Sequence, residues 1–320
     1  MPLFGQEDGS TPPLQRFDVV SSMDGKPQPV LYWAPEQANV QETPLLVFLH
    51  SWSGDYRQDN SKWLKQAVEQ GWIFLHPNFR GANNSPQAGG SRWARQDILD
   101  AMDEICRRFR VDPERVYLAG VSGGGHMSML MAGHHPDRFS AVSAWVGISD
   151  LAEWHRFHTR GGTPSKYAKM IEACLGGPPG TSEQIDADYR DRSPLYHIAR
   201  AHSAVGNSLP VAIWAGVDDG HSGSVPVSHS LLAFNQIALA GGSKLITDAE
   251  IRELLQQRRL TVPTHEDLQT DAALGRKILL RRRADSSMVT IFAGGHESIP
   301  EAAIEHLKGQ RRRVPLQTGS

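Results

Sequence analysis

The chain has 320 residues, of which 39% are hydrophobic, and its 33 basic and 35 acidic side chains leave a formal net charge of −2. That length can bury a large core, and we expect a single α/β domain over residues 1–320. The balanced charge argues against a nucleic acid or an anionic membrane as partner, and no apolar run approaches the ~20 residues of a membrane span. Nothing in the composition predicts an oligomeric state.

The first nine residues carry neither a basic segment nor an apolar segment, so no secretory signal is recognised. This predicts a cytoplasmic protein, or a secreted one if a signal has been removed. Cys106 and Cys174 are too few for a disulfide framework or a zinc site, and no bridge between them is expected. The basic runs 281–283 and 311–313 lack interleaved aromatic residues and are expected to be solvated surface.

The N-terminal half alternates strand and helix patterns. Residues 16–21 and 29–33 predict two antiparallel strands, and the apolar runs 44–50 and 72–77 are typical of strands buried on both faces. Amphipathic helices are expected between these strands and after them, at residues 62–70 and 92–109. The pattern predicts a mostly parallel central sheet with helices on both faces.

A nucleophile elbow is predicted at residues 116–128, where a short apolar strand leads into a Gly-x-Ser-x-Gly turn and then a helix. Such a turn strains the backbone at Ser122 and projects its hydroxyl from the sheet. Small neighbours at Gly120, Gly123 and Gly124 let two backbones pass closely. The motif also occurs in ordinary turns, but its place between a strand and a helix favours the elbow.

The C-terminal half is expected to supply three more strands, at residues 139–147, 209–215 and 288–292. Residues 151–204 read as a small helical cap insertion over the site, and residues 244–283 as an extra, largely helical arm. Aromatic and histidine side chains of the cap could line a substrate groove, although packing is the commoner role for each: Trp154, His155, Phe157, His158 and Tyr167.

A catalytic triad is predicted from chain order, because a serine, then an acid, then a histidine after the last strand is the order of the α/β-hydrolases. His296 can take the proton of Ser122, since an imidazole titrates near neutral pH, and a buried carboxylate would fix its tautomer. Asp219 is the preferred acid from its Gly-x-x-Asp spacing after Gly216. Asp218 remains the alternative.

Other histidines fit the base role less well. His221 adjoins the acid and is the main rival, and it is also a candidate for substrate contact. His50 is expected to brace the neighbouring loop, and His126 to face the packing of its helix. His134 with His135, and His155 with His158, lack the further ligands of a catalytic zinc site, so neither a metal nor a cofactor is predicted.

The loop after residues 44–50 is the predicted source of a second oxyanion donor, because the α/β-hydrolase fold places one there. By position this donor is the backbone N–H of Trp52, acting with that of Gly123 at the helix N-terminus. The indole of Trp52, together with Trp154, is a candidate wall for the substrate. A plain polar turn with a packed tryptophan is the other interpretation.

Several short motifs in the right order resemble the prolyl oligopeptidase-like branch of the α/β-hydrolases, and within it stand-alone enzymes similar to feruloyl and acetyl xylan esterases. They cover about residues 29–300 and comprise residues 50–54, 78–81, 112–116, 120–124, 192–194, 216–219 with 225–226, and 294–297. The resemblance implies the triad Ser122, Asp219 and His296. Its usual His-Gly start of the oxyanion loop is His50-Ser51 here, and a β-propeller has no room.

We therefore expect a serine carboxylic-ester hydrolase that works through an acyl-enzyme, on aryl or acetyl esters linked to carbohydrate by family analogy. The substrate would be a small molecule or a carbohydrate-linked ester. A peptidase acting on short peptides is the first alternative, and a catalytically inactive binding module the second.

Overall fold

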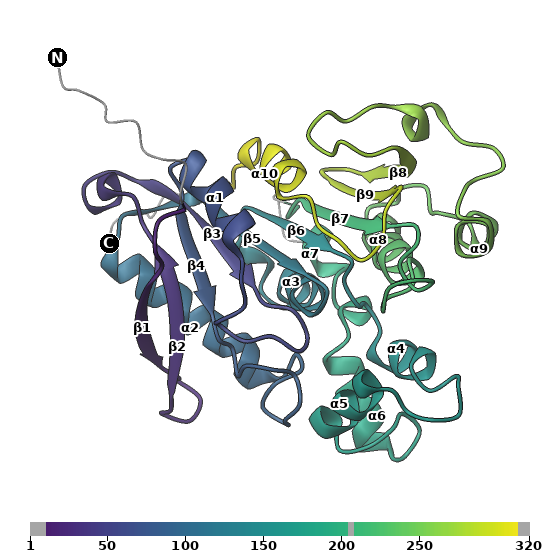
Figure 1. The fold of residues 1–320 in the computed structure, drawn as a ribbon, viewed down its shortest axis with the longest axis horizontal. Helices are drawn as coiled ribbons and strands as arrows, with labels where there is room; N and C mark the ends of the chain where they lie inside the picture. Colours follow the sequence, from purple (N-terminus) through teal and green to yellow (C-terminus); the bar gives the residue numbers. More distant parts are fainter. Residues whose placement is uncertain (1–10, 204–207, 313–320) are drawn as a thin grey trace.

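The computed structural model describes residues 11–203 and 208–312, so residue 204 of the cap range, Arg313 and both ends of the expected domain lie outside the described part. Its centre is a nine-stranded sheet in the order β1-β2-β4-β3-β5-β6-β7-β9-β8 (Figure 1). The strands are β1 (Gln15–Val20), β2 (Pro27–Trp33), β3 (Thr43–Leu49), β4 (Ile73–Pro77), β5 (Val111–Val121), β6 (Ala141–Trp145), β7 (Val211–Gly216), β8 (Ile278–Ala284) and β9 (Ser287–Phe292).

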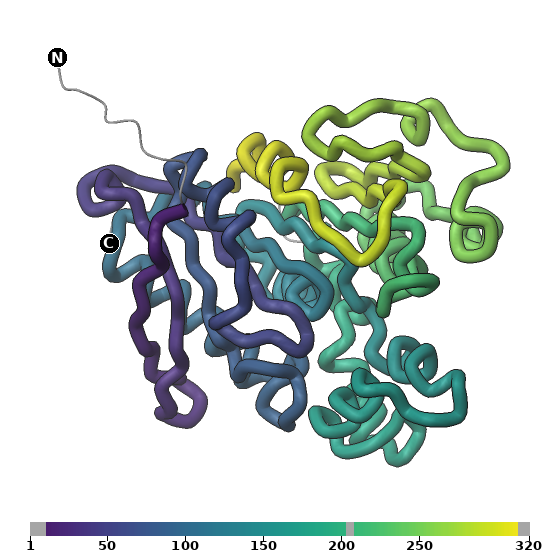
Figure 2. Tube along the Cα trace, viewed as in Figure 1, coloured from purple at the N-terminus to yellow at the C-terminus, as the bar shows by residue number. Residues whose placement is uncertain are grey.

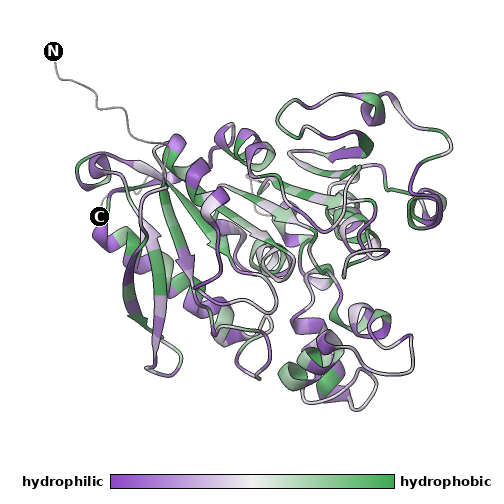
Figure 3. Cartoon of the chain, in the orientation of Figure 1, coloured by the Kyte–Doolittle hydropathy of each residue, from purple (hydrophilic) through white to green (hydrophobic). Residues whose placement is uncertain are grey.

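The six central strands, from β4 through β3, β5, β6 and β7 to β9, run parallel, and the pairs at both edges are antiparallel. The prediction of a mostly parallel sheet is confirmed. Strands β3, β4, β6, β7 and β9 are buried along their whole length, which explains their continuous apolar sequences. Figure 3 shows these strands mainly in the hydrophobic colour.

Helices cover both faces of the sheet. Helices α1 and α10 pack on each other, whereas α3, α7 and α8 form a second group. The helices are α1 (Ser61–Glu69), α2 (Arg92–Arg108), α3 (Gly123–His134), α4 (Leu151–Phe157), α5 (Lys166–Leu175), α6 (Glu183–Asp191), α7 (Arg200–Ser203), α8 (Ser228–Ala240), α9 (Asp248–Gln257) and α10 (Pro300–Lys308). Within the described ranges no helix has the length and apolar character needed to cross a bilayer.

The segment between β6 and β7 forms a helical lobe beside the sheet, built from α4, α5 and α6 (Figure 2). The lobe has its own apolar cluster, which includes Trp154, Ile171 and Tyr189, and this cluster also takes in Trp52 from the loop after β3. The lobe therefore shares buried side chains with the main domain at that loop.

The expected helical arm at residues 244–283 needs correction. Only α9 and a single 3-10 turn, η4 (His265–Leu268), are helical there, and the range ends in strand β8. Strand β8 pairs antiparallel with β9 at the edge of the sheet. Its sequence, ILLRRRA, hid it because the three arginines broke the apolar run.

The solvated-surface prediction for residues 281–283 is wrong for Arg281, whose side chain is buried in β8, and for Arg282, whose side chain is 13% exposed and paired with Glu250 and Asp267. Arg281 Nε donates to Thr290 Oγ1 at 3.0 Å, and its Nη2 donates to Asp271 Oδ2 at 2.9 Å. A buried guanidinium is tolerated here because these partners replace its lost water. Arg283 is exposed, as predicted.

This difference predicts unequal stability effects. Arg281→Ala removes the cation of a partly buried pair and leaves the Asp271 carboxylate with only its bond from Leu274 N, so we expect a loss of about 2 kcal/mol in the free energy of unfolding. The exposed neighbour is the matched control, and Arg283→Ala should change that free energy by less than about 0.5 kcal/mol. Urea unfolding followed by circular dichroism measures both. Equal losses in the two variants would contradict the analysis.

Candidate active site

Ser122 stands at the sharp turn between β5 and α3. Its backbone has φ 60° and ψ −116°, a conformation that costs free energy in a residue with a side chain. Two backbone hydrogen bonds hold Ser122 in this conformation. Ser122 N donates to Trp145 O at 2.8 Å, and His126 N donates to Ser122 O at 2.8 Å. The side chain is 7% exposed. This is the geometry that a nucleophile elbow requires.

The elbow lies directly against the loop that follows β3. A Cβ atom added to Gly123 would stand 2.3 Å from Trp52 N, and one added to Gly124 would stand 2.1 Å from Leu49 O. Both contacts are to backbone that cannot move aside. Glycine is therefore required at these two positions by close approach of the chains.

Two backbone amides at this contact have no acceptor. Among the described residues, neither Trp52 N nor Gly123 N takes part in a hydrogen bond. Gly123 is the first residue of α3, where the helix dipole adds partial positive charge. Two free N–H groups from facing backbone segments can donate hydrogen bonds to a developing oxyanion.

Asp219 and His296 meet through a direct hydrogen bond. His296 Nδ1 donates to Asp219 Oδ2 at 2.7 Å, and the other carboxylate oxygen accepts from Gly220 N and Val225 N, both at 3.0 Å. Asp219 is 1% exposed. A buried carboxylate held by three donors keeps the proton of the imidazole on Nδ1 and leaves Nε2 free to accept one.

The alternative acid, Asp218, and the alternative base, His221, do not take part in this hydrogen-bonded pair. Asp218 has a side chain that is 41% exposed and forms a 3.4 Å ion pair with Arg258. His221 is exposed, and its backbone N donates to Asp218 O. The structure thus brings Asp219, and neither Asp218 nor His221, into contact with His296.

Ser122 and His296 belong to loops that converge although their strands, β5 and β9, are separated by β6 and β7. A cavity of about 240 Å³ is lined by Val121 and Ser51 and, from the loop carrying His296, by Ser298. That loop therefore crosses the strand ends to reach the elbow. No hydrogen bond joins Ser122 to His296 in the described chain, and catalytic contacts of this kind are often long in unliganded enzymes.

The helical lobe contacts the loops on both sides of the elbow. Trp154 packs edge-on against Trp52 with ring centroids 4.9 Å apart, and its Nε1 donates to Ser224 O at 2.8 Å in the loop that follows Asp219. The expected role of the two indoles as substrate walls is not supported, because Trp52 is 1% exposed and Trp154 is fully buried. Packing inside the molecule uses their apolar surface.

His50 and His126 lie where the sequence places them. The ring of His50 stacks on Phe79 at 3.8 Å, and its nitrogens lie 3.0 Å from Ser51 O and 2.8 Å from Asn78 O, so it braces the loop. His126 is buried in α3, and its Nε2 donates to Arg192 O at 2.7 Å, which ties the elbow helix to the lobe.

The sequence did not indicate a structural role for Arg192. This side chain is 9% exposed, and its Nη1 donates to the carbonyls of Pro86, Ala88 and Cys174. It joins the lobe to the chain before α2 through backbone oxygens alone. This connecting role is visible only from hydrogen-bond partners that are distant in the sequence. Residues 192–194 are one of the motifs that carry the family resemblance, but that motif did not indicate the role.

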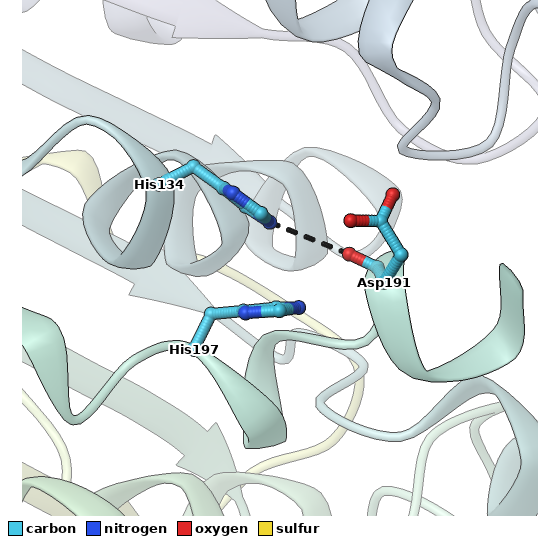
Figure 4. Close-up of side chains that lie close together, drawn as sticks. All are labelled: His134, Asp191 and His197. Atoms are coloured by element: carbon cyan, nitrogen blue, oxygen red, sulfur yellow. Dashed lines mark hydrogen bonds between the residues drawn. The ribbon is translucent and has the colours of Figure 1, made fainter. Parts of the chain in front are cut away.

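A cluster of His134, Asp191 and His197 brings three potential metal ligands within 4.8 Å of one another (Figure 4). Arg95 already occupies this cluster, because its Nη1 lies 3.0 Å from His134 Nε2 and its Nη2 lies 3.0 Å from Asp191 Oδ2. A fixed guanidinium repels a second cation at the same atoms. The cluster suits a helix-to-lobe connection better than a metal ion.

His126 makes stability depend on pH. Burial lowers its pKa from 6.5 to about 4, because the charged form would lose water. Between these values the unfolded chain binds a proton that the native chain does not. This contribution to stability is therefore complete above pH 6.5 and declines as the pH falls towards 4.

We expect His126→Gln to flatten the fall of the unfolding free energy between pH 7 and 4.5, by up to about 3 kcal/mol over the whole window. Urea unfolding at several pH values measures the slope. The exposed histidine His265 supplies the control, since His265→Gln should leave the slope unchanged. A slope in His126→Gln equal to that of the native chain would refute the assignment.

Comparisons with known proteins identify the family and the fold of this chain. The sequence pattern of the prolyl oligopeptidase family matches residues 59–247. Acylamino-acid-releasing enzyme 1 of Oryza sativa subsp. japonica is 26% identical over 206 residues, which are 59% of this chain and 24% of that protein. An acetylxylan esterase of Coprinopsis cinerea is 27% identical over 155 residues, 43% of this chain and 40% of that protein. The chain thus spans less than half the length of either relative.

A solved structure extends the likeness to nearly the whole chain. The acylaminoacyl peptidase of Pyrococcus horikoshii superposes with a TM-score of 0.60 at 19% identity, covering 93% of this chain and 40% of that one. This shows the fold, and the prediction of an α/β-hydrolase fold is confirmed. Since the family pattern also runs through more than half of the sequence, the chain belongs to the prolyl oligopeptidase family, a family of serine hydrolases.

Proposed function

We propose that this chain hydrolyses carboxylic esters through a covalent acyl-enzyme on Ser122, with aryl or acetyl esters of carbohydrate as the favoured substrates. The observation that carries the proposal is the 2.7 Å bond between buried Asp219 and His296, on a loop that reaches an elbow with two unpaired amides. Acyl transfer needs a base, a nucleophile and an oxyanion cradle at one place.

In the first half of the reaction, His296 Nε2 accepts the proton of Ser122 while the hydroxyl oxygen attacks the ester carbonyl carbon. The carbonyl electrons move to oxygen, and the N–H groups of Trp52 and Gly123 donate to that oxyanion. Collapse of the intermediate breaks the bond to the leaving alcohol, which receives its proton from His296. Asp219 stabilises the imidazolium between these two transfers.

In the second half, water takes the place of the alcohol. His296 accepts one proton of the water while the water oxygen attacks the acyl carbon. The N–H groups of Trp52 and Gly123 then donate to the second oxyanion. The bond to Ser122 then breaks, and the serine oxygen takes the proton back from His296. The products are the free acid and the regenerated enzyme.

The polarity of the surface beside the elbow supports a hydrophilic leaving group. The cavity of about 240 Å³ is lined by polar side chains that include Asp59, Ser61 and Lys62. Lys62 and Ser298 also line an adjoining hollow of about 400 Å³ with Arg276 and Glu297. Hydroxyl groups of a sugar find donors and acceptors on such a surface. The acetylxylan esterase relative points in the same direction.

A peptidase is the second candidate, because the acylamino-acid-releasing relative matches a longer part of the chain than the esterase relative does. Amides are harder substrates than esters for the same machinery, so hydrolysis of a matched pair separates the two candidates. A binding module that keeps the fold without chemistry is the third, and it predicts no reaction at Ser122.

The pair Asp219 and Asp218 provides a matched test of the triad. Asp219→Asn removes the charge that orients and stabilises the imidazole of His296, and we expect kcat to fall by about 10³- to 10⁴-fold. Asp218→Asn changes a half-exposed neighbour and should stay within about 2-fold. Hydrolysis of 4-nitrophenyl acetate gives both values. A larger loss for Asp218→Asn would move the acid role to that residue.

Covalent labelling tests Ser122 and the reaction class together. We expect a fluorophosphonate to label the chain stoichiometrically and to leave Ser122→Ala unlabelled, since only an activated hydroxyl attacks phosphorus. We expect hydrolysis of an acetyl ester of xylose and no hydrolysis of acetyl-alanine anilide. Hydrolysis of the anilide supports the peptidase, and absence of both labelling and hydrolysis supports the binding module.

A further inference from the structure

We propose that Gln58 and Asn60 are positioning residues that hold the oxyanion loop, and with it the amide of Trp52, in place for the reaction. The inference rests on the proposed function, because it assigns these side chains a role towards the Trp52 donor. Neither residue belongs to a motif singled out in the sequence. Both lie in the segment between β3 and α1.

The carbonyl oxygen of Ser51 fixes one side of the peptide that carries the Trp52 amide. Gly54 N donates to Ser51 O at 3.0 Å, and Nδ1 of His50 lies 3.0 Å from the same oxygen. In a trans peptide the N–H points away from the carbonyl. The Trp52 N–H therefore points away from this turn, and its nitrogen lies against Gly123.

A chain of four hydrogen bonds holds the other side of Ser51. Ser51 N donates to Gln58 Oε1 at 2.9 Å, and Gln58 Nε2 donates to Asn60 Oδ1 at 2.9 Å. Asn60 Nδ2 then meets His76 Nε2 at 3.0 Å, and His76 Nδ1 meets Phe48 O at 2.8 Å. The chain starts and ends on the segment 48–51, so it closes a ring around the turn.

The direction of each bond in this ring is fixed by chemistry. A backbone carbonyl only accepts, so His76 Nδ1 must carry the proton and Nε2 must accept from Asn60. His76 is fully buried, and burial lowers its pKa to about 4, so the ring is neutral near pH 7. The amides of Asn60 and Gln58 then have only one orientation that satisfies every partner.

Gly54 gives the ring its space. A Cβ atom added to Gly54 would stand 2.4 Å from Gln58 Oε1, the atom that accepts from Ser51. The end of a glutamine side chain can move aside, whereas the backbone cannot. Gly54→Ala therefore displaces the Gln58 amide and breaks its bond to Ser51 without changing any group of the ring.

The test compares two glutamines near the same helix. Gln58→Leu removes the acceptor of Ser51 N, and we expect kcat for 4-nitrophenyl acetate to fall by about 10- to 100-fold with KM changed less than about 3-fold. Gln66→Leu in α1 removes a hydrogen bond to Glu69 and is the matched control, expected within about 2-fold. Thermal unfolding of both variants measures general destabilisation.

Two further readouts separate positioning from stability. Inhibition by phenylboronic acid, whose adduct on the serine places an oxygen in the oxyanion site, should weaken by the same factor as kcat in Gln58→Leu. Gly54→Ala should lose kcat to a similar extent, and Gly54→Ala with Gln58→Leu should lose no more than either alone. If Gln58→Leu does not fold, Gly54→Ala decides the question.

A value of kcat in Gln58→Leu equal to that of Gln66→Leu would overturn the positioning role, as would additive losses in the double variant. Failure of the proposed function has a different signature. If the native enzyme shows no turnover that Ser122→Ala abolishes, the proposed reaction is contradicted. If the native enzyme is active and Gln58→Leu keeps its full kcat, only the positioning role is contradicted.

Discussion

The site depends on the close packing of two backbones, the elbow after β5 and the loop after β3. Strands β3 and β5 are direct neighbours, with Leu49 paired to Gly120, so the two loops leave the sheet side by side. The contact at Gly123 leaves no room for a side chain. Strain at Ser122 persists because the sheet and the helix on either side hold the turn from both ends. The placement of the proposed nucleophile and of both proposed oxyanion donors follows from this single contact.

The helical lobe is part of the same framework. Trp52 lies in the apolar cluster of the lobe, and Trp154 of the lobe bonds to the loop beyond Asp219. His126 and Arg192 add connections from the elbow helix and from the chain before α2. The side chains that a sequence suggests as substrate walls thus serve to join the lobe to the loops that carry the chemistry.

The histidines around the site differ in burial and in hydrogen-bond partners, and these differences decide their roles. His50, His76 and His126 are buried, and burial lowers the pKa of each; for His76 and His126 it falls to about 4, so these two act as neutral hydrogen-bonding groups near pH 7. His296 is partly exposed and is paired with a buried carboxylate. Among these four, only His296 has both a charged partner that stabilises the imidazolium and a nitrogen free for proton transfer.

The sequence alone predicted the buried parallel strands along the chain, the elbow and the candidate residues Ser122, Asp219 and His296, because apolar runs and glycine turns act locally. It could not find β8, since Arg281 is acceptable in a strand only when distant Thr290 and Asp271 receive its guanidinium. It preferred Asp219 to Asp218 from spacing alone but could not show which of them meets His296, nor that Gln58 accepts a hydrogen bond from Ser51 and is itself held by Asn60. These contacts join residues that are far apart in the chain or depend on the direction in which a side chain points. Only the folded sheet brings such partners within hydrogen-bonding distance.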